Sequence, residues 1–190
     1  MIQTRKQLRQ CLAADKPYYH DGREGLQWLL DLLFCREQTV IWRYVRVMRR
    51  CDYFTSNKHR SLWHSLMYFY YLRRHNRLSV KLGLIIGAGA FGPGLCIYHT
   101  GNIVVNGYSR IGKNCRLHGS NCIGNSHSRT DCPVIGDNVR FGVGAKAFGD
   151  IYIANNVTIA AGAVVTKSCF EEGVTLAGVP AKIIKHANIS

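Results

Sequence analysis

The sequence predicts a mainly β protein, a parallel β-helix built from hexapeptide repeats, with an α-helical region in front of it. Two observations carry this prediction: apolar residues recur every six positions through the last hundred residues, and glycine is nearly confined to the same part of the chain. A period of six fits neither an α-helix nor a simple strand, and is typical of short segments that turn a corner with the leading side chain inward. The leading residues are Val105, Ile111, Leu117, Ile123, Ile135, Phe141, Ala147, Ile153, Ile159 and Val165.

A second inward position follows most leading residues four places later. Between Ile123 and Ile135 the spacing is twelve, so the period is kept, but residues 124–133 are polar and rich in turn formers. We interpret them as a loop that leaves the solenoid, and loops on rigid scaffolds often carry function. The second inward set is Cys115, Val139, Ala145, Ile151, Val157, Ala163 and Cys169.

Composition divides the chain into an α-helical N-terminal region, residues 1–80, and a solenoid with a C-terminal tail, residues 81–190. The first region holds two of the 19 glycines and the second holds 17. Corners in the backbone favour glycine, whereas helices disfavour it. Apolar spacing predicts helices over 3–13, 24–50 and 59–75. A break is expected at Asp15-Lys16-Pro17, because proline disfavours helix in the residue before it.

The charge of the chain suggests a polyanionic partner. The net charge is +14, of which residues 1–80 carry +9 and residues 81–190 carry +5. A basic balance of this size is compatible with an anionic membrane surface, an acidic polysaccharide or a phosphate-rich cofactor. For a polysaccharide or a membrane surface, the expected contacts are Arg43, Arg46, Arg49 and Arg50. No nucleic-acid-binding motif is visible, so no nucleic acid is expected.

The cysteine pattern indicates a reducing compartment. The eight cysteines form no CxxC pair, and several fall at inward positions where a thiol behaves as a small hydrophobe. There is neither a signal peptide nor an apolar run long enough to span a membrane. We expect a cytoplasmic protein, with peripheral contact to the inner membrane left open.

Three separated segments resemble the serine acetyltransferase branch of the hexapeptide acyltransferases: residues 92–105 (GPGLCIYHTGNIVV), 142–151 (GVGAKAFGDI) and 177–182 (AGVPAK). The resemblance covers about residues 81–185. It implies a left-handed β-helix, a homotrimer or dimer of trimers with sites between subunits, acetyl-CoA as the donor and no metal. It also implies that His99 deprotonates the acceptor hydroxyl for direct attack on the thioester. A hydroxyl is a poor nucleophile at neutral pH and needs such a base; a structural histidine in a coil corner is the alternative.

The chain departs from the family pattern at charged positions. Tyr98 stands where the family has an aspartate for the substrate ammonium, and Leu84 stands where an aspartate orients the histidine. Asp131-Cys132-Pro133 replaces an Arg-His-Pro that helps to bind the substrate carboxylate. These losses favour a neutral acceptor. The expected acceptor is therefore a glycan, a sugar hydroxyl of a surface or capsular polysaccharide or its precursor. Two alternatives stay open: a serine O-acetyltransferase of cysteine biosynthesis and a non-catalytic trimeric scaffold.

Further site residues follow from their places around His99 and from the resemblance. Each has an ordinary surface or turn role as its alternative. The acceptor-binding candidates are Tyr98, Asn102, His118, His127, Arg129 and Asp131. The resemblance points to small residues that let the pantetheine arm approach the backbone, and lysines can meet the CoA phosphates. These cofactor candidates are Gly144, Ala145, Ala161, Gly162, Lys167, Lys182 and Lys185.

Two other chemistries have weaker support. His99, His118 and His127 could form a zinc triad as in the hexapeptide-repeat carbonic anhydrases, but nothing in the sequence fixes their relative geometry. Cys132 as a nucleophile is not needed, because direct transfer from CoA forms no covalent enzyme intermediate. We therefore expect an acetyl-CoA-dependent O-acetyltransferase with His99 as its general base.

Overall fold

The computed structural model describes residues 1–20, 22 and 25–186, and it begins with helices. Thr4 opens the first of them with a capping box, in which its side chain and that of Gln7 each accept from the other residue's backbone N–H. The first helix ends at Asp15, as the sequence predicts. The helices are α1 (Arg5–Asp15), α2 (Pro17–His20), α3 (Leu26–Leu33), α4 (Glu37–Asn57) and α5 (Leu62–Leu82).

The single helix predicted over 24–50 is instead two helices. The chain turns between α3 and α4, where Cys35 adopts a left-handed φ of 52°. A non-glycine residue in this conformation does not continue a helix. The turn makes Glu37 the first residue of α4, where an acidic side chain also suits the helix dipole.

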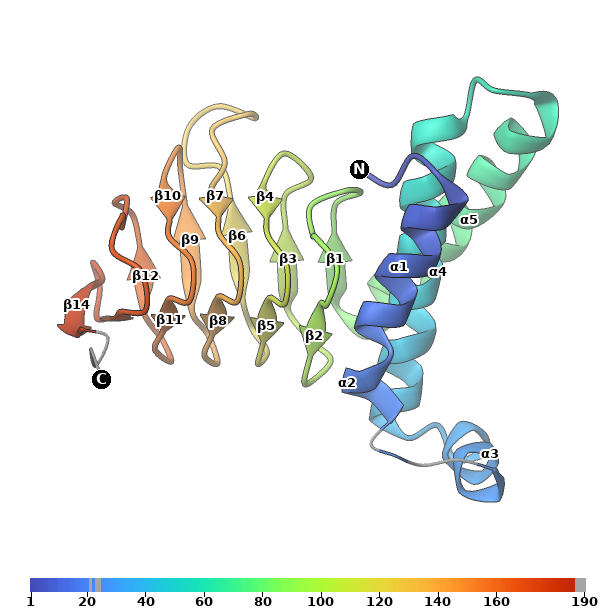
Figure 1. The fold of residues 1–190 in the computed structure, drawn as a ribbon, viewed down its shortest axis with the longest axis horizontal. Helices are drawn as coiled ribbons and strands as arrows, with labels where there is room; N and C mark the ends of the chain where they lie inside the picture. The colour runs from blue at the N-terminus through green and yellow to red at the C-terminus, as the bar shows by residue number, and fades with distance from the viewer. Residues whose placement is uncertain (21, 23–24, 187–190) are drawn as a thin grey trace.

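After Gly83 the chain forms a solenoid of parallel strands in three sheets (Figure 1). One sheet has the order β1-β3-β6-β9-β12, one β4-β7-β10, and one β2-β5-β8-β11-β13 with β14 added antiparallel. From β3 to β12, successive strands visit the three sheets in turn, and this builds the coil. The left-handed sense of the coil stays a prediction of the resemblance. The strands are β1 (Leu84–Ile86), β2 (Cys96–Ile97), β3 (Ile103–Val105), β4 (Arg110–Ile111), β5 (Arg116–Leu117), β6 (Cys122–Gly124), β7 (Val134–Ile135), β8 (Arg140–Phe141), β9 (Lys146–Phe148), β10 (Tyr152–Ile153), β11 (Thr158–Ile159), β12 (Val164–Val165), β13 (Thr175–Ala177) and β14 (Lys182–Lys185).

The inward positions predicted from the period of six are all buried. Every leading residue and every residue of the second inward set lies in one hydrophobic core. Equivalent positions stack from coil to coil, as where Leu117 pairs with Phe141 and Phe141 with Ile159. Within the segment at 124–133, Gly124 ends β6, and residues 125–130 leave this stack as an exposed loop before β7. The predicted period and loop are thus confirmed.

Asparagines line one corner of the coil. Asn114, Asn138 and Asn156 all have left-handed φ values, 55°, 59° and 61°. The side-chain amide of Asn114 donates to Asn138 over 2.9 Å, and that of Asn138 donates to Asn156 over 2.9 Å. Asparagine tolerates this backbone conformation better than most residues. The corner therefore combines a turn residue with a hydrogen-bonded ladder, which we call the asparagine ladder.

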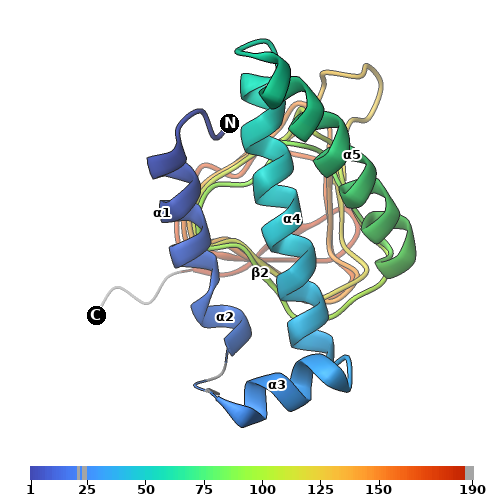
Figure 2. The same cartoon turned by 90° about the vertical axis from the view of Figure 1, so that its right-hand side faces the viewer.

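The helices pack across the first coil and share its core (Figures 1 and 2). Arg49 on α4 and Asp15 on α1 form a buried bidentate pair at 2.8 and 3.0 Å. Arg49 also donates to the carbonyls of Phe91 and Gly92, while Asp15 accepts from the backbone N–H groups of residues 94 and 95. The pair thus holds two helices on the coil. Because Arg49 is buried in this pair, it does not contribute to the basic surface that the sequence predicts.

Candidate functional site

His99 follows β2 at the coil nearest the helices, and its side chain is 64% exposed. Its Nδ1 lies 3.2 Å from Oε2 of Glu37. The other carboxylate oxygen, Oε1, accepts from the backbone N–H and the hydroxyl of Thr100, at 2.8 and 3.0 Å. The first turn of α4 is therefore hydrogen-bonded to the segment that carries His99.

These contacts fix the charge of Glu37. The hydrogen bond from the Thr100 backbone, followed by those from His99 and the Thr100 hydroxyl, lowers the pKa of the Glu37 carboxyl against a smaller opposing effect of burial. Glu37 is thus ionised at neutral pH and can only accept. A carboxylate facing Nδ1 favours the His99 tautomer with its proton on Nδ1, which leaves Nε2 as the basic atom.

Tyr98 and His118 form a wall beside His99. Their rings stack at 4.3 Å between centroids and 21° between planes. Gln38, the residue after Glu37, donates to the Tyr98 carbonyl over 2.9 Å. Burial lowers the pKa of His118, and the positive charges of Arg140, His99 and Arg116 lower it further. A neutral His118 can stack and form hydrogen bonds without adding charge to the site.

The predicted loop residues form a separate cluster. His127 contacts the Ser126 hydroxyl at 3.0 Å, and that hydroxyl donates to Asp131 over 2.9 Å. The Arg129 guanidinium lies 5.7 Å from the ring centroid of Tyr108. The loop lies at the upper edge of the solenoid, whereas β2 lies toward the lower edge of the solenoid (Figure 1). Within one chain, the structure does not bring these loop residues to His99.

The same arrangement separates His127 from His99 and His118, the other two histidines of the zinc alternative. Among residues 1–20, 22 and 25–186, no group of three or more histidine, cysteine, aspartate and glutamate side chains is placed to hold a metal ion. Cys132 is buried, and burial is the largest cause that raises the pKa of its thiol, which donates to the Arg129 carbonyl. Asn102 is exposed at a corner with φ 49°.

The predicted cofactor residues divide into two groups. Gly144, Ala161 and Gly162 lie at an accessible corner, and both glycines have φ 70°. The side chain of Ala145 instead points into the core and is fully buried, so only its backbone is left for the predicted approach of the pantetheine arm. Ala145 occupies the second inward position of its repeat, which had already placed it inside.

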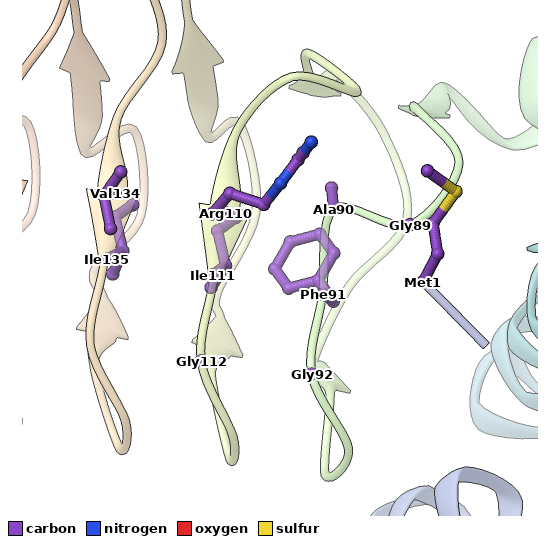
Figure 3. A pocket seen from close by; sticks show the side chains of 10 residues that line it. All are labelled: Met1, Gly89, Ala90, Phe91, Gly92, Arg110, Ile111, Gly112, Val134 and Ile135. Carbon is purple, nitrogen blue, oxygen red and sulfur yellow. The ribbon is translucent and has the colours of Figure 1, made fainter. Parts of the chain in front are cut away.

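Two of the three predicted lysines share a pocket at the C-terminal end of the solenoid. Lys167 and Lys182 line a pocket of about 360 Å³ together with residues 168–171. Lys185, on β14, is exposed but does not line it. Another pocket of about 350 Å³ lies beside the first coils between Met1 and Val134 (Figure 3). Its one charged lining residue, Arg110, donates to the carbonyls of residues 107 and 109, so this pocket offers no acid or base.

Glu37 is the site residue that the sequence analysis missed. The solenoid repeats alone predict a His99 without a nearby carboxylate, because both family positions for one are occupied by Leu84 and Tyr98. The structure corrects this: a helix far away in sequence brings the carboxylate. The acidic residue at the start of an apolar helix was the available signal, and the missed break between α3 and α4 concealed it.

The chain is similar to serine acetyltransferases in sequence and in fold. It is 33% identical over 128 residues to the serine acetyltransferase of Buchnera aphidicola subsp. Schizaphis graminum, a match that covers 65% of this chain and 49% of the relative. The chain thus spans about half the length of the curated relative that it matches. No family model matches the chain.

Solved structures give the same result. Neisseria gonorrhoeae serine acetyltransferase in complex with serine has a TM-score of 0.67 at 27% identity, over 95% of this chain and 70% of that one. A serine acetyltransferase in complex with CoA has a TM-score of 0.70 at 24% identity, over 95% of this chain and 71% of that one.

These findings overturn the prediction of a surface or capsular polysaccharide as the acceptor. The matched proteins are serine acetyltransferases, which was the stated alternative. The prediction failed because it counted charges along the solenoid only, whereas Glu37 reaches the site from α4. By fold, and by sequence over 65% of its length, the chain is thus similar to serine acetyltransferases.

Proposed function

We propose that this chain is an acetyl-CoA-dependent O-acetyltransferase that acetylates the hydroxyl of serine, with His99 as the general base. The observation that carries the proposal is the 3.2 Å contact between His99 Nδ1 and an ionised Glu37. It leaves Nε2 of an exposed imidazole available to a hydroxyl. The similarity to serine acetyltransferases supports serine as the acceptor.

The proposed reaction is a direct transfer. His99 Nε2 takes the proton of the serine hydroxyl as the oxygen attacks the thioester carbonyl of acetyl-CoA. The tetrahedral intermediate collapses with cleavage of the C–S bond, and the imidazolium returns the proton to the departing CoA sulfur. Glu37 stabilises the imidazolium in between, as a carboxylate does in other histidine bases.

Charge at the site also fits an amino acid better than the sequence suggested. A serine ammonium needs a negative partner when it leaves water. Glu37, 42% exposed beside His99, supplies that charge. The accessible corner at Gly144 and Gly162, and the pocket of Lys167 and Lys182, are the proposed places for the pantetheine arm and the CoA phosphates.

The proposed assembly is a trimer of left-handed solenoids. Such an assembly would let the loop at 124–133 of one subunit complete the site around His99 of its neighbour. This would explain why these two parts lie at different edges of one chain (Figure 1). The eight free cysteines support a reducing compartment, for which we propose the cytoplasm.

The test measures CoA release from acetyl-CoA with and without L-serine. His99→Asn should lower serine-dependent turnover by at least about 100-fold, the usual contribution of a general base. His59→Asn is the matched control, because His59 is also exposed and lies between α4 and α5, at the end of α4 opposite Glu37. It should keep wild-type turnover.

Circular dichroism of both variants confirms that they are folded. Turnover by His99→Asn equal to that of the wild type would refute the assigned base. Wild-type protein that releases CoA with another hydroxyl compound but not with serine would refute the acceptor, and no release with any acceptor would favour a scaffold.

A further inference from the structure

A further pocket, of about 240 Å³, lies between α4 and α5, away from the His99 site and from the two pockets described above. Figure 2 shows these two helices side by side in front of the solenoid. Arginines three and four residues apart share one face of α4, and α5 adds another across the groove. The lining residues are Arg43, Arg46, Val47, Arg50, Tyr71 and Arg74. We call this the four-arginine pocket.

The charges in this pocket have no counterpart within it. No acidic side chain is among its lining residues. Burial lowers the pKa of Arg46, and Arg50, Arg43 and Arg74 lower it further through their positive charges. Like charges four apart on a helix destabilise it. The folded chain therefore bears a repulsion that an anion would relieve.

The guanidinium groups also have hydrogen-bonding capacity to spare. Arg46 Nε is buried and has no hydrogen-bond partner among the described residues. Arg50 donates through Nη1 to the Arg46 carbonyl, and Arg74 donates through Nη1 to the Tyr70 hydroxyl. Each guanidinium has five N–H donors, so most of them are left for a ligand. A buried donor without a partner is costly, and a ligand oxygen would satisfy it.

We propose that the four-arginine pocket binds an oxyanion of the phosphate class. The planar fork of arginine matches the oxygens of a phosphate in two parallel hydrogen bonds, and several arginines around one small concavity suit a compact, multiply charged group. The site is distinct from the proposed CoA-phosphate pocket. That pocket lies beside β14, at the far end of the solenoid from α4 (Figure 1).

The test is thermal unfolding of the full chain against inorganic pyrophosphate, at constant ionic strength kept with potassium chloride. The unfolding midpoint should rise by about 5 °C when pyrophosphate exceeds its dissociation constant about a hundredfold. The variant Arg46→Gln/Arg74→Gln should lose this rise. Its midpoint without the anion should equal or exceed that of the wild type, because the repulsion is relieved.

The matched control is Arg73→Gln/Arg77→Gln, which removes the same charge from exposed positions that do not line the pocket. It should keep the full rise. Equal responses from the two variants would overturn the proposal, because the effect would then be general charge or binding at the CoA site.

A second arm distinguishes a free phosphate from a lipid headgroup. Sedimentation with vesicles of phosphatidylglycerol and phosphatidylcholine is compared with vesicles of phosphatidylcholine alone. Retention by the anionic vesicles that only Arg46→Gln/Arg74→Gln loses would assign the same pocket to a headgroup. If neither pyrophosphate nor anionic vesicles distinguish this variant from the control variant, the pocket is not an anion site.

Discussion

At the scale of single residues, the contact between Glu37 and His99 decides how the site works. Both side chains are partly exposed, so their mutual attraction is screened by water and adds little to folding stability. Its importance lies in orientation: a carboxylate held by the Thr100 backbone presents a fixed oxygen to Nδ1. Glu37 therefore positions His99 in addition to its proposed contact with the serine ammonium, and its effect should appear in kinetics rather than in stability.

Glu37→Gln should lower kcat of the serine-dependent reaction by about tenfold or more, because the neutral amide no longer stabilises the imidazolium. The KM for serine should rise as well, because the amide carries no negative charge for the serine ammonium. Glu37→Asp should restore part of the rate. The measurement is CoA release as a function of serine concentration, which separates kcat from KM.

Glu172→Gln is the matched control, since Glu172 is an exposed carboxylate that accepts from Asn155 on the solenoid. It should leave both kcat and KM unchanged. A Glu37→Gln enzyme whose kcat and KM equal those of the wild type would refute the proposed role of Glu37.

His99 could be predicted from sequence and Glu37 could not, for a physical reason. His99 sits in a run of residues whose order along the chain is also their order in space, so a local pattern identifies it. Glu37 lies 62 positions away, and its role depends on how α4 packs against the first coil. Tertiary placement of this kind leaves no local pattern.

At the scale of elements, the asparagine ladder shows what holds the corners of the coil. The inward residues were predictable because a repeat of six aligns them in every coil. The ladder is not part of the prediction, although its residues Asn114, Asn138 and Asn156 follow one corner of the coil. Its stability comes from two sources, the left-handed turn and the side-chain hydrogen bonds.

Asn138→Ala should lower the free energy of unfolding by about 2 kcal/mol. The substitution removes both ladder hydrogen bonds, and alanine tolerates the left-handed φ less well than asparagine. Asn138→Gly should cost only about half as much, because glycine accepts the backbone conformation. Urea unfolding of both variants measures the difference. Equal losses would mean that the turn conformation contributes nothing.

At the scale of the whole molecule, a buried carboxyl links stability to pH. Asp52 on α4 accepts from the backbone N–H of Gly89 over 2.9 Å, and burial is the main cause that raises its pKa from 3.8 to about 6. The folded chain therefore holds this proton more tightly than the unfolded chain. The contribution of Asp52 to stability is fully present below about pH 4 and is lost as pH rises through about 6.

Asp52→Asn should remove this dependence, because asparagine keeps an oxygen acceptor for Gly89 and never ionises. Between pH 4 and pH 7, the wild type should lose up to about 3 kcal/mol of unfolding free energy relative to the variant. Urea midpoints across this range give the difference, in which the titration of other groups cancels. If the urea midpoints of the two proteins change with pH in parallel, the raised pKa of Asp52 is contradicted.

The buried pair of Asp15 and Arg49 has a consequence for how copies of the chain meet. The terminal turn of a β-helix presents peptide groups with no further turn to bond to, a template on which another chain can stack. Here, side chains of α1 and α4 occupy the carbonyls of Phe91 and Gly92 and the N–H groups of the next turn segment. The helices thus terminate an otherwise open-ended array, and a solenoid stripped of them would be prone to end-to-end fibre growth.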